Sequence, residues 1–252
     1  MTELAARRFF GIRADDVTWN EFLARIETFI AEGTPHQIAT VNPEFVMAAR
    51  RDPEFRQIIN NAALAIPDGV GLLWAGRLLN QPLRQRVTGS DGLPRIARRA
   101  VERGWRLFLL GAAPGVAEET ARRLVERYPG LQIAGTYAGS PAVEEEKSIV
   151  ERIRRARPDV LFVAYGHPKQ DKWIARNLAR LGVPVCMGVG GAFDFIAGVQ
   201  ARAPAWVQRA SLEHFYRLLQ QPWRWRRQID VYHFGLLALY TSLKQRFGST
   251  GR

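Results

Sequence analysis

Two polar residues stand where acid–base chemistry could occur, each directly after a short apolar run typical of a buried strand. Asn42 follows residues 36–41, and Asp68 follows residues 63–66 inside a Pro-Asp-Gly turn. A carboxylate at the end of such a strand can accept the proton of an attacking hydroxyl group. Each residue also has a structural explanation, because Asn before Pro caps helices and Asp is favoured in tight turns. The pattern alone leaves both interpretations open.

Polar or glycine-rich positions follow most of the other apolar runs as well. In a parallel sheet, the carboxyl ends of the strands meet at one edge, where ligands bind. We therefore expect these positions to contribute to one substrate site. The candidate substrate-binding residues are Thr40, Asn42, Gly111, Tyr137, Gln170, Gly188, Gly190, Gly191 and Asp194.

The glycine-rich segment at residues 188–193 approximates a dinucleotide-binding fingerprint but departs from it in two respects. Phe193 occupies the place of the third small residue, and no acidic residue follows about 20 positions later in a second strand–helix–strand unit. Backbone amides in this segment could still approach a nucleotide diphosphate. Alternatively, the glycines only let the chain turn as it leaves the strand, and they bind no ligand.

The side chains that most often bind metals are dispersed along the chain. The four histidines are His36, His167, His214 and His233, and none has a second ligand at helical spacing. No Asp-x-Asp pair is present, so a nucleotide-sugar enzyme would lack the usual carboxylate grip on Mg²⁺ or Mn²⁺. We therefore predict no metal and no cofactor, and we expect cationic side chains to neutralise any diphosphate.

Positive charge is concentrated at the C-terminus. The chain has a net charge of +12, and residues 200–252 carry eight arginines and one lysine against two acids. Arg217, Arg224 and Arg227 are spaced to share one side of a helix, and guanidinium groups bind phosphate through paired hydrogen bonds. Such a segment requires an acidic partner, namely nucleic acid, anionic lipid or a diphosphate.

An apolar stripe follows these arginines at helical spacing. Its residues are Ile229, Tyr232, Leu236, Leu239, Tyr240 and Leu243. Beside a basic flank, this pattern is typical of a helix that lies on an anionic membrane surface. A terminal helix docked on the rest of the protein is the alternative, and exposed apolar faces could also serve a homo-oligomer.

Apolar runs alternate with amphipathic segments through the first 199 residues. Strands are predicted at residues 36–41, 63–66, 105–110, 131–137, 159–165 and 183–189, with helices at 19–31, after 43, at 91–103, 114–127 and 140–157, and ending near 180. This order predicts an α/β fold with a mostly parallel, Rossmann-like sheet and flanking helices. We divide the chain into this α/β domain, residues 1–199, and a basic, aromatic, helical C-terminal appendage, residues 200–252.

Composition excludes several classes of protein. With 47% hydrophobic and 24% charged residues, the chain can form a packed core and is not intrinsically disordered. The single cysteine, Cys186, excludes an intramolecular disulfide framework. No apolar run reaches the roughly 18 residues of a membrane-spanning helix, and no secretory signal opens the chain. We therefore expect a cytoplasmic protein.

Together, the motifs resemble those of the WecG/TagA/CpsF glycosyltransferases, which form glycosyltransferase family 26 and include N-acetylmannosaminyltransferases. The matching segments, in order, are residues 40–43, 67–71, 86–91, 166–171, 188–194, 202–204 and 213–217. Each segment alone is weak evidence, whereas the ordered set is specific. Residues beyond 230 match less well.

The resemblance implies an inverting, metal-independent enzyme. Such an enzyme moves a sugar from a UDP-sugar to a polyprenyl-diphosphate-linked saccharide, as a peripheral protein on the cytoplasmic face of the bacterial inner membrane. The sugar would be N-acetylmannosamine, its uronic acid or glucose, in cell-surface polysaccharide or exopolysaccharide synthesis. The expected partners are thus the donor, the lipid-linked acceptor and the anionic membrane surface, with no nucleic acid.

The resemblance also implies roles for individual residues. Asp68 matches the proposed catalytic base. The substrate-binding set comprises Thr40, Asn42, Arg86 and Gln170 in the matching pocket segments, with Asp194 and its preceding glycines on the uridine side. Arg217, Arg224 and Arg227 match a catalytic appendage that closes over the site.

Two alternatives from other functional classes stay open at this point. A basic nucleic-acid-binding protein would explain the charge, although the sequence contains no recognisable nucleic-acid-binding motif. An NAD-dependent oxidoreductase would explain the α/β pattern, although the broken fingerprint argues against it.

Overall fold

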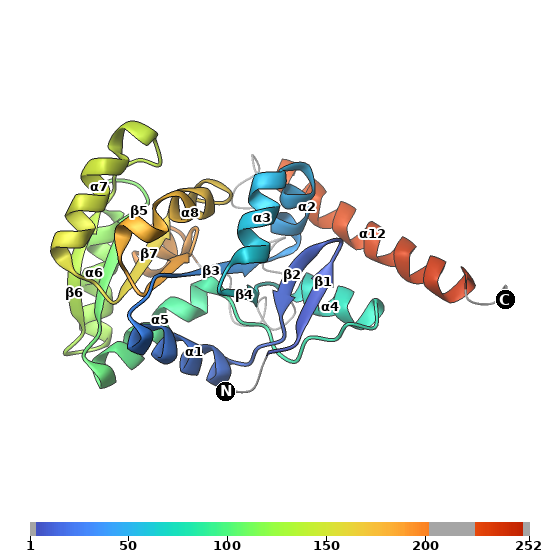
Figure 1. The fold of residues 1–252 in the computed structure, drawn as a ribbon, viewed down its shortest axis with the longest axis horizontal. Coiled ribbons are helices and arrows are strands. Elements are labelled where there is room, and N and C mark those ends of the chain that lie inside the picture. The colour runs from blue at the N-terminus through green and yellow to red at the C-terminus, as the bar shows by residue number, and fades with distance from the viewer. Residues whose placement is uncertain (1–3, 202–224, 249–252) are drawn as a thin grey trace.

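The computed structural model describes residues 4–201 and 225–248, which are organised around a six-stranded sheet (Figure 1). Its strands are β3 (His36–Val41), β4 (Leu64–Pro67), β5 (Arg106–Gly111), β6 (Gln132–Tyr137), β7 (Val160–Ala164) and β8 (Val185–Gly188), and a separate hairpin consists of β1 (Ala6–Phe9) and β2 (Ile12–Asp15). The order across the main sheet is β4-β3-β8-β7-β5-β6, and every neighbouring pair is parallel. The predicted α/β fold with a parallel sheet is confirmed.

Helices cover both faces of this sheet (Figure 1). They are α1 (Trp19–Glu32), α2 (Pro43–Arg51), α3 (Pro53–Asn61), α4 (Val70–Leu78), α5 (Gly89–Arg103), α6 (Val116–Arg127), α7 (Val143–Ala156), α8 (Lys169–Leu181), α9 (Ala192–Ile196) and α12 (Trp225–Gly248). Every connection between consecutive strands of the main sheet contains at least one of these helices. Parallel strands require such crossovers, because a tight turn cannot return the chain to the same end of the sheet.

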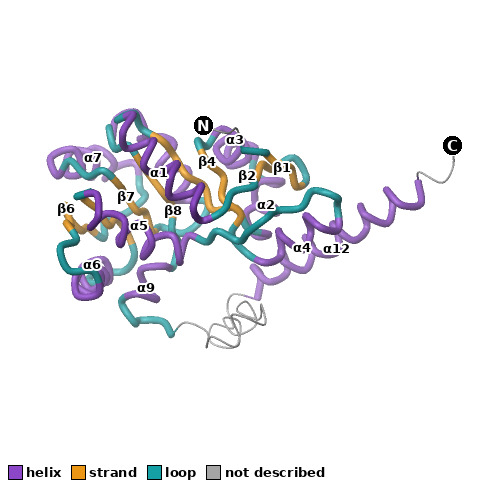
Figure 2. Tube along the Cα trace, turned by 90° about the horizontal axis from the view of Figure 1, so that it is seen from below, coloured by secondary structure: helices purple, strands orange, loops and turns teal. Residues whose placement is uncertain are grey.

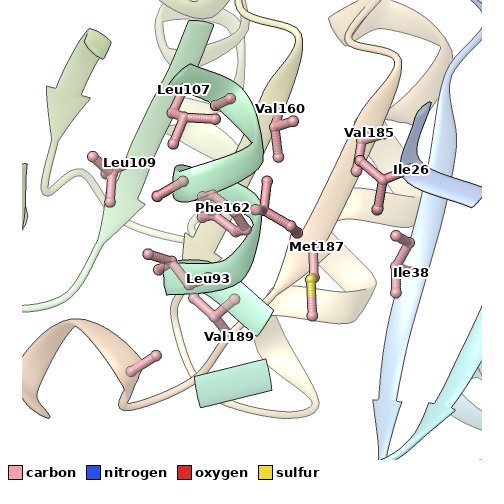
Figure 3. Packing of buried hydrophobic residues seen from close by; sticks show 14 of the residues in the cluster. Ile26, Ile38, Leu93, Leu107, Leu109, Val160, Phe162, Val185, Met187 and Val189 are labelled. Atoms are coloured by element: carbon pink, nitrogen blue, oxygen red, sulfur yellow. The ribbon is translucent and has the colours of Figure 1, made fainter. Parts of the chain in front are cut away.

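The core lies on both sides of the sheet and uses alternate residues of each strand. On β7, Val160 and Phe162 pack into one apolar cluster with α1, α5, α6 and α9 (Figure 3), whereas Leu161 and Val163 pack against α7 and α8. Successive side chains of a strand point to opposite faces, so a strand covered on both faces must be apolar throughout. This burial explains the continuous apolar runs in the sequence.

The hairpin of β1 and β2 is absent from the sequence-based prediction. Its turn consists of Phe10 and Gly11, whose φ angles are both positive, at 54° and 85°. At the end of β2, the fully buried Asp15 carboxylate accepts a hydrogen bond of 2.8 Å from the Ala65 N–H. The hairpin is thus tied to β4. Strands of four residues carry too little periodicity to be recognised in the sequence.

Two helices in the first half of the chain are also missing from the prediction. The first, α3, has an ordinary start signal, because the Asp52 side chain accepts a hydrogen bond of 3.0 Å from the Phe55 N–H. The second, α4, starts after Gly69, which offers no side-chain cap. The sequence of α4 is also apolar on both its buried and its exposed sides, so it lacks amphipathic periodicity.

The C-terminal helix α12 packs against α2 and α4 (Figure 2). Phe234 and Ala238 are buried in the apolar cluster that includes residues of α2 and α4, and the Phe234 ring meets the Phe10 ring edge-on at 5.7 Å. The Asp230 carboxylate accepts hydrogen bonds of 2.7 and 2.6 Å from the Arg51 guanidinium. The predicted terminal helix is confirmed, and it is docked on the α/β unit.

The opposite side of α12 exposes an apolar surface, which we call the α12 stripe. It consists of Ile229, Tyr232, Leu236, Leu239, Tyr240 and Leu243, whose side chains are 37–64% exposed. The docked face agrees with the interpretation as a terminal helix packed on the protein, whereas contact of the exposed apolar face with a membrane stays a prediction. In residues 4–201 and 225–248, no helix has both the length and the apolar character needed to cross a membrane.

The docking of α12 can be tested at Phe234. We expect Phe234→Ala to lower the free energy of unfolding by about 3 kcal/mol, because the change removes a buried ring and leaves a cavity. Leu236→Ala, on the exposed side of the same helix, should alter that free energy by less than about 0.5 kcal/mol. Urea denaturation followed by circular dichroism measures both. Equal effects of the two changes would contradict docking through Phe234.

Candidate active site

A cavity of about 460 Å³ opens at the carboxyl ends of β3, β4, β7 and β8. The first residues of α2, α4 and α5 form part of its wall, and Gln228 and Val231 of α12 line it as well. Eight of the predicted substrate-site residues line it together, namely Thr40, Asn42, Asp68, Arg86, Gln170, Gly190, Gly191 and Asp194.

Asp68 lies in the turn between β4 and α4, where two neighbouring segments hold it. Its backbone N–H donates a hydrogen bond of 2.7 Å to the Val41 carbonyl oxygen. Its carboxylate Oδ2 accepts a hydrogen bond of 3.2 Å from the Gly89 N–H, in the first turn of α5. A β-carbon at Gly89 would lie 3.1 Å from Thr40 Cγ2, so the helix start fits closely against β3. The carboxylate therefore faces the cavity in a fixed position.

Asn42 has a structural role and also lines the cavity. Its Oδ1 accepts a hydrogen bond of 2.9 Å from the Phe45 N–H, which caps α2, and Pro43 occupies the first helical position. The helix-cap interpretation is confirmed. The same geometry holds the Asn42 side chain at the cavity wall.

Arg86 and Thr88 approach the cavity on the segment that leads into α5. The Thr88 hydroxyl group accepts a hydrogen bond of 3.1 Å from the Asp91 N–H, and the Thr88 hydroxyl donates one of 2.9 Å to the Asp91 carboxylate. The backbone before them is anchored beside β4, because the Val87 N–H donates to the Pro67 carbonyl oxygen at 2.9 Å. This capped helix start positions both side chains and the Gly89 N–H that holds Asp68.

Gln170 joins two loops of the site. Its Oε1 accepts hydrogen bonds from the N–H groups of Gly166, at 3.1 Å, and Gly190, at 3.0 Å, and the residue is 1% exposed. A β-carbon at Gly188 would lie 2.5 Å from Gln170 Nε2, so only glycine leaves room for this side chain. Gly188 thus serves packing, and it is not among the residues that line the cavity.

The departure from the dinucleotide fingerprint has a structural reason. Phe193 is fully buried in the apolar cluster beneath the sheet, where its backbone carbonyl accepts a hydrogen bond of 3.1 Å from the Thr120 hydroxyl group. A small residue there would leave part of the core empty. Gly190 has a φ angle of 52°, which suits a residue without a side chain at the turn before α9.

Gly111 and Tyr137 do not line the cavity. Gly111 allows β5 to approach β7, because a β-carbon there would lie 2.9 Å from the Ala164 carbonyl carbon. Tyr137 ends β6 at the far edge of the sheet, where the Arg152 guanidinium lies 4.5 Å from its ring centre. The prediction placed both residues by their position after a strand, but the strand order separates β5 and β6 from β3 and β4.

Several cavity residues are missing from the prediction. His167 lies 3.6 Å from the Glu44 carboxylate, between Nε2 and Oε2, and its ring centre is 4.8 Å from that of Phe45. His167 belongs to a segment that the sequence singled out, so its place near Gln170 could have suggested it. Gln228 and Val231 gave no signal, because their contribution depends on how α12 docks.

Acidic groups outnumber basic ones on the described part of the cavity wall. Glu44, Asp68 and Asp194 line it, against Arg86 and His167. A diphosphate bound there would require further positive charge. Of the predicted arginines, Arg217 and Arg224 lie outside the described residues, and of Arg227 the structure describes only the helical backbone.

No group of three or more His, Cys, Asp or Glu side chains is arranged to hold a metal ion in the part of the chain that the structure describes. The prediction of a site without metal stays a prediction.

Asp171, next to Gln170 on α8, is a buried acid beside the cavity. It is fully buried, and neither of its carboxyl oxygens has a hydrogen-bond partner among the described residues. Burial away from water raises the pKa of this carboxyl to about 7. Its backbone carbonyl accepts a hydrogen bond of 3.0 Å from the Gln37 side chain, which links α8 to β3.

The structure is an α/β fold with a candidate active site at the carboxyl edge of its parallel sheet. The model of the glycosyl transferase WecG/TagA/CpsF family matches residues 7–248 of the chain. The chain therefore belongs to this family and is a glycosyltransferase. Family membership supports neither the nucleic-acid-binding nor the NAD-dependent alternative.

Similar proteins that share one name occur in Bacillus and Staphylococcus species. An N-acetylglucosaminyldiphosphoundecaprenol N-acetyl-β-D-mannosaminyltransferase of Bacillus subtilis strain 168 is 36% identical over 80% of this chain and 78% of its own length. Proteins of this name from Bacillus spizizenii and from Staphylococcus aureus strain MW2 are each 33% identical, over 86% of this chain and 84% of their own length.

The buried acid makes stability depend on pH. The pKa of Asp171 is about 7 in the folded protein and about 4 in an unfolded chain, so the folded state binds the extra proton between these pH values. Stability should therefore fall as the pH rises from about 4 to about 7, by at most about 1.4 kcal/mol per pH unit. Asp171→Asn should raise the melting temperature more at pH 8 than at pH 5. The exposed change Glu151→Gln should show no such difference, and an equal effect of Asp171→Asn at both pH values would contradict the assignment.

Proposed function

We propose that this glycosyltransferase moves N-acetylmannosamine, its uronic acid or glucose from a UDP-sugar to a polyprenyl-diphosphate-linked saccharide during cell-surface polysaccharide synthesis. The observation that carries the proposal is the Asp68 carboxylate at the cavity wall, held by the Gly89 N–H. The names of the similar proteins support a lipid-diphosphate-linked N-acetylglucosamine acceptor and N-acetylmannosamine as the first sugar to test.

The proposed reaction is a single displacement with inversion. A hydroxyl oxygen of the acceptor attacks the anomeric carbon, and the bond between that carbon and the diphosphate oxygen breaks. UDP leaves with the bonding electron pair, and Asp68 takes the proton of the attacking hydroxyl group. Because Gly89 holds one carboxylate oxygen in place, the base needs no rearrangement before it acts.

The nucleotide is assigned to the part of the cavity formed by the β8–α9 loop. Gly190 and Gly191 expose backbone there, and Asp194 lies in the first turn of α9. Gln170 fixes this loop through its hydrogen bond to the Gly190 N–H. A rigid loop that carries no side chains at Gly190 and Gly191 lets a nucleotide diphosphate approach the backbone closely.

The leaving diphosphate gains negative charge as its bond to the sugar breaks. The acidic balance of the described cavity wall makes additional cations necessary in a mechanism without metal. We assign this role to Arg217, Arg224 and Arg227, which precede or begin α12 in the sequence. A preorganised donor of this kind contributes about 3 kcal/mol to the stabilisation of a transition state.

The membrane-facing surface is assigned to the α12 stripe. The lipid-linked acceptor resides in a bilayer, so the enzyme must work at its surface. The stripe is open on the side of α12 that faces away from the core, and residues 200–252 carry an excess of arginine. Apolar insertion combined with attraction to anionic headgroups binds such helices peripherally. We place the enzyme on the cytoplasmic face of the inner membrane, where UDP-sugars are available.

The proposed base can be tested by Asp68→Asn. We expect turnover, measured as UDP release from UDP-N-acetylmannosamine with lipid-linked N-acetylglucosamine, to fall by about 10²- to 10⁴-fold, because the amide cannot accept the proton. Binding of UDP, measured by calorimetry, should change little. Asp52→Asn, a helix cap outside the cavity, is the control. Retained turnover in Asp68→Asn would remove Asp68 as the base.

The membrane assignment can be tested on the α12 stripe. Leu236→Glu should weaken binding to phosphatidylglycerol vesicles at least about tenfold, since it replaces an apolar contact with a charge that the anionic surface repels. The matched control is Val143→Glu on α7, which is also well exposed but lies away from the stripe. Co-sedimentation measures both, and equal binding of the two variants would refute the assignment.

A further inference from the structure

One face of α4 combines a cavity residue with exposed apolar surface. Val70 lines the cavity and is 37% exposed, and Trp74, one helical turn later, is 49% exposed. Arg77 is exposed at the next position of the same face. The opposite face is ordinary core, because Leu72 and Ala75 are fully buried.

Helix α4 extends away from the Asp68 carboxylate, which is the proposed base. The helix begins two residues after Asp68, and a rise of about 1.5 Å per residue places Trp74 roughly 6 Å beyond Val70 along its axis. A β-carbon at Gly71 would lie 2.7 Å from Pro43 Cγ, so α4 and the start of α2 are in close contact. The direction of the exposed face is thereby fixed.

A large exposed indole next to a substrate cavity requires an explanation. Isolated apolar residues on a surface are common, but here Val70 lines the cavity and Trp74 lies one helical turn beyond it on the same exposed face. A contact with the bilayer alone would explain Trp74, whereas it would not explain an apolar residue in the cavity wall. A ligand whose polar end lies in the cavity and whose apolar end leaves it would explain both.

Helix α4 packs beside α12, which carries the α12 stripe on the side turned away from this contact (Figure 2). Arg77, beyond Trp74, adds a cation at the outer end of the face. Tryptophan and arginine are both suited to the boundary between apolar and aqueous phases of a membrane.

We propose that Val70 and Trp74 form a subsite for the first isoprene units of the acceptor's polyprenyl chain. The subsite rests on the proposed function, because it assumes a lipid-linked acceptor. It guides the chain from the diphosphate in the cavity, along the exposed face of α4, to the membrane surface. Its contribution is to acceptor binding, and it takes no part in the chemical step.

The test compares two acceptors with the same head group, N-acetylglucosamine diphosphate. One carries a long polyprenyl chain and the other a methyl group in its place, and both are assayed in the same detergent with UDP-N-acetylmannosamine as donor. For Trp74→Ala, we expect KM for the polyprenyl acceptor to rise about tenfold and KM for the methyl acceptor to change less than about twofold. Values of kcat should stay unchanged, and Trp74→Phe should restore most of the affinity.

The control for this test is a substitution of an exposed apolar residue far from the cavity. Val143→Ser, an exposed apolar position on α7 away from the cavity, should leave both KM values unchanged. Equal increases of KM for the two acceptors, or no increase for either, would overturn the subsite. Weaker binding of Trp74→Ala to phosphatidylglycerol vesicles with an unchanged KM ratio would assign Trp74 to the bilayer instead. If the natural enzyme transferred no sugar to either acceptor from UDP-N-acetylmannosamine, from its uronic acid form or from UDP-glucose, the proposed function itself would be overturned, and the subsite with it.

Discussion

The hydrogen bond between the Gly89 N–H and the Asp68 carboxylate links the parts of the protein on which the site depends. It joins the end of β4 to the start of α5, two segments separated by 21 positions in the sequence. The fit is close, because a β-carbon at Gly89 would lie 3.1 Å from Thr40 Cγ2 on the neighbouring strand. The capped start of α5, the exit of β3 and the candidate base are therefore fixed relative to one another. Such preorganisation is what an enzyme needs when charge develops in the transition state.

Much of the fold could be predicted because its strands are buried on both faces. The burial of β5 and β7 is visible in the sequence as nearly continuous apolar runs. The hairpin of β1 and β2 and the helix α4 lacked such signals, since the strands are very short and α4 is apolar on both sides. Because α4 was not predicted, the sequence analysis contained no indication of the proposed lipid subsite, which lies on the exposed face of that helix.

The site was predictable where function follows from local position in the chain. Asp68, Asn42 and Gln170 each follow a strand that lies at the cavity, so the rule that ligands bind at strand ends located them. The same rule also selected Gly111 and Tyr137, which do not line the cavity, because the rule does not include the order of strands across the sheet. Gln228 and Val231 could not be found at all, since they reach the cavity only through the docking of α12.

Positive charge is concentrated in the C-terminal segment rather than on the described wall of the cavity. The chain carries a net charge of +12, yet acidic groups outnumber basic ones among the described cavity residues. An acidic cavity wall of that kind repels a diphosphate unless cations are brought to it. Under the proposed function, those cations belong to the basic segment that also bears the membrane-facing helix. Catalysis and membrane attachment would then depend on the same part of the chain, so that UDP-sugar is activated only where the lipid-linked acceptor is present.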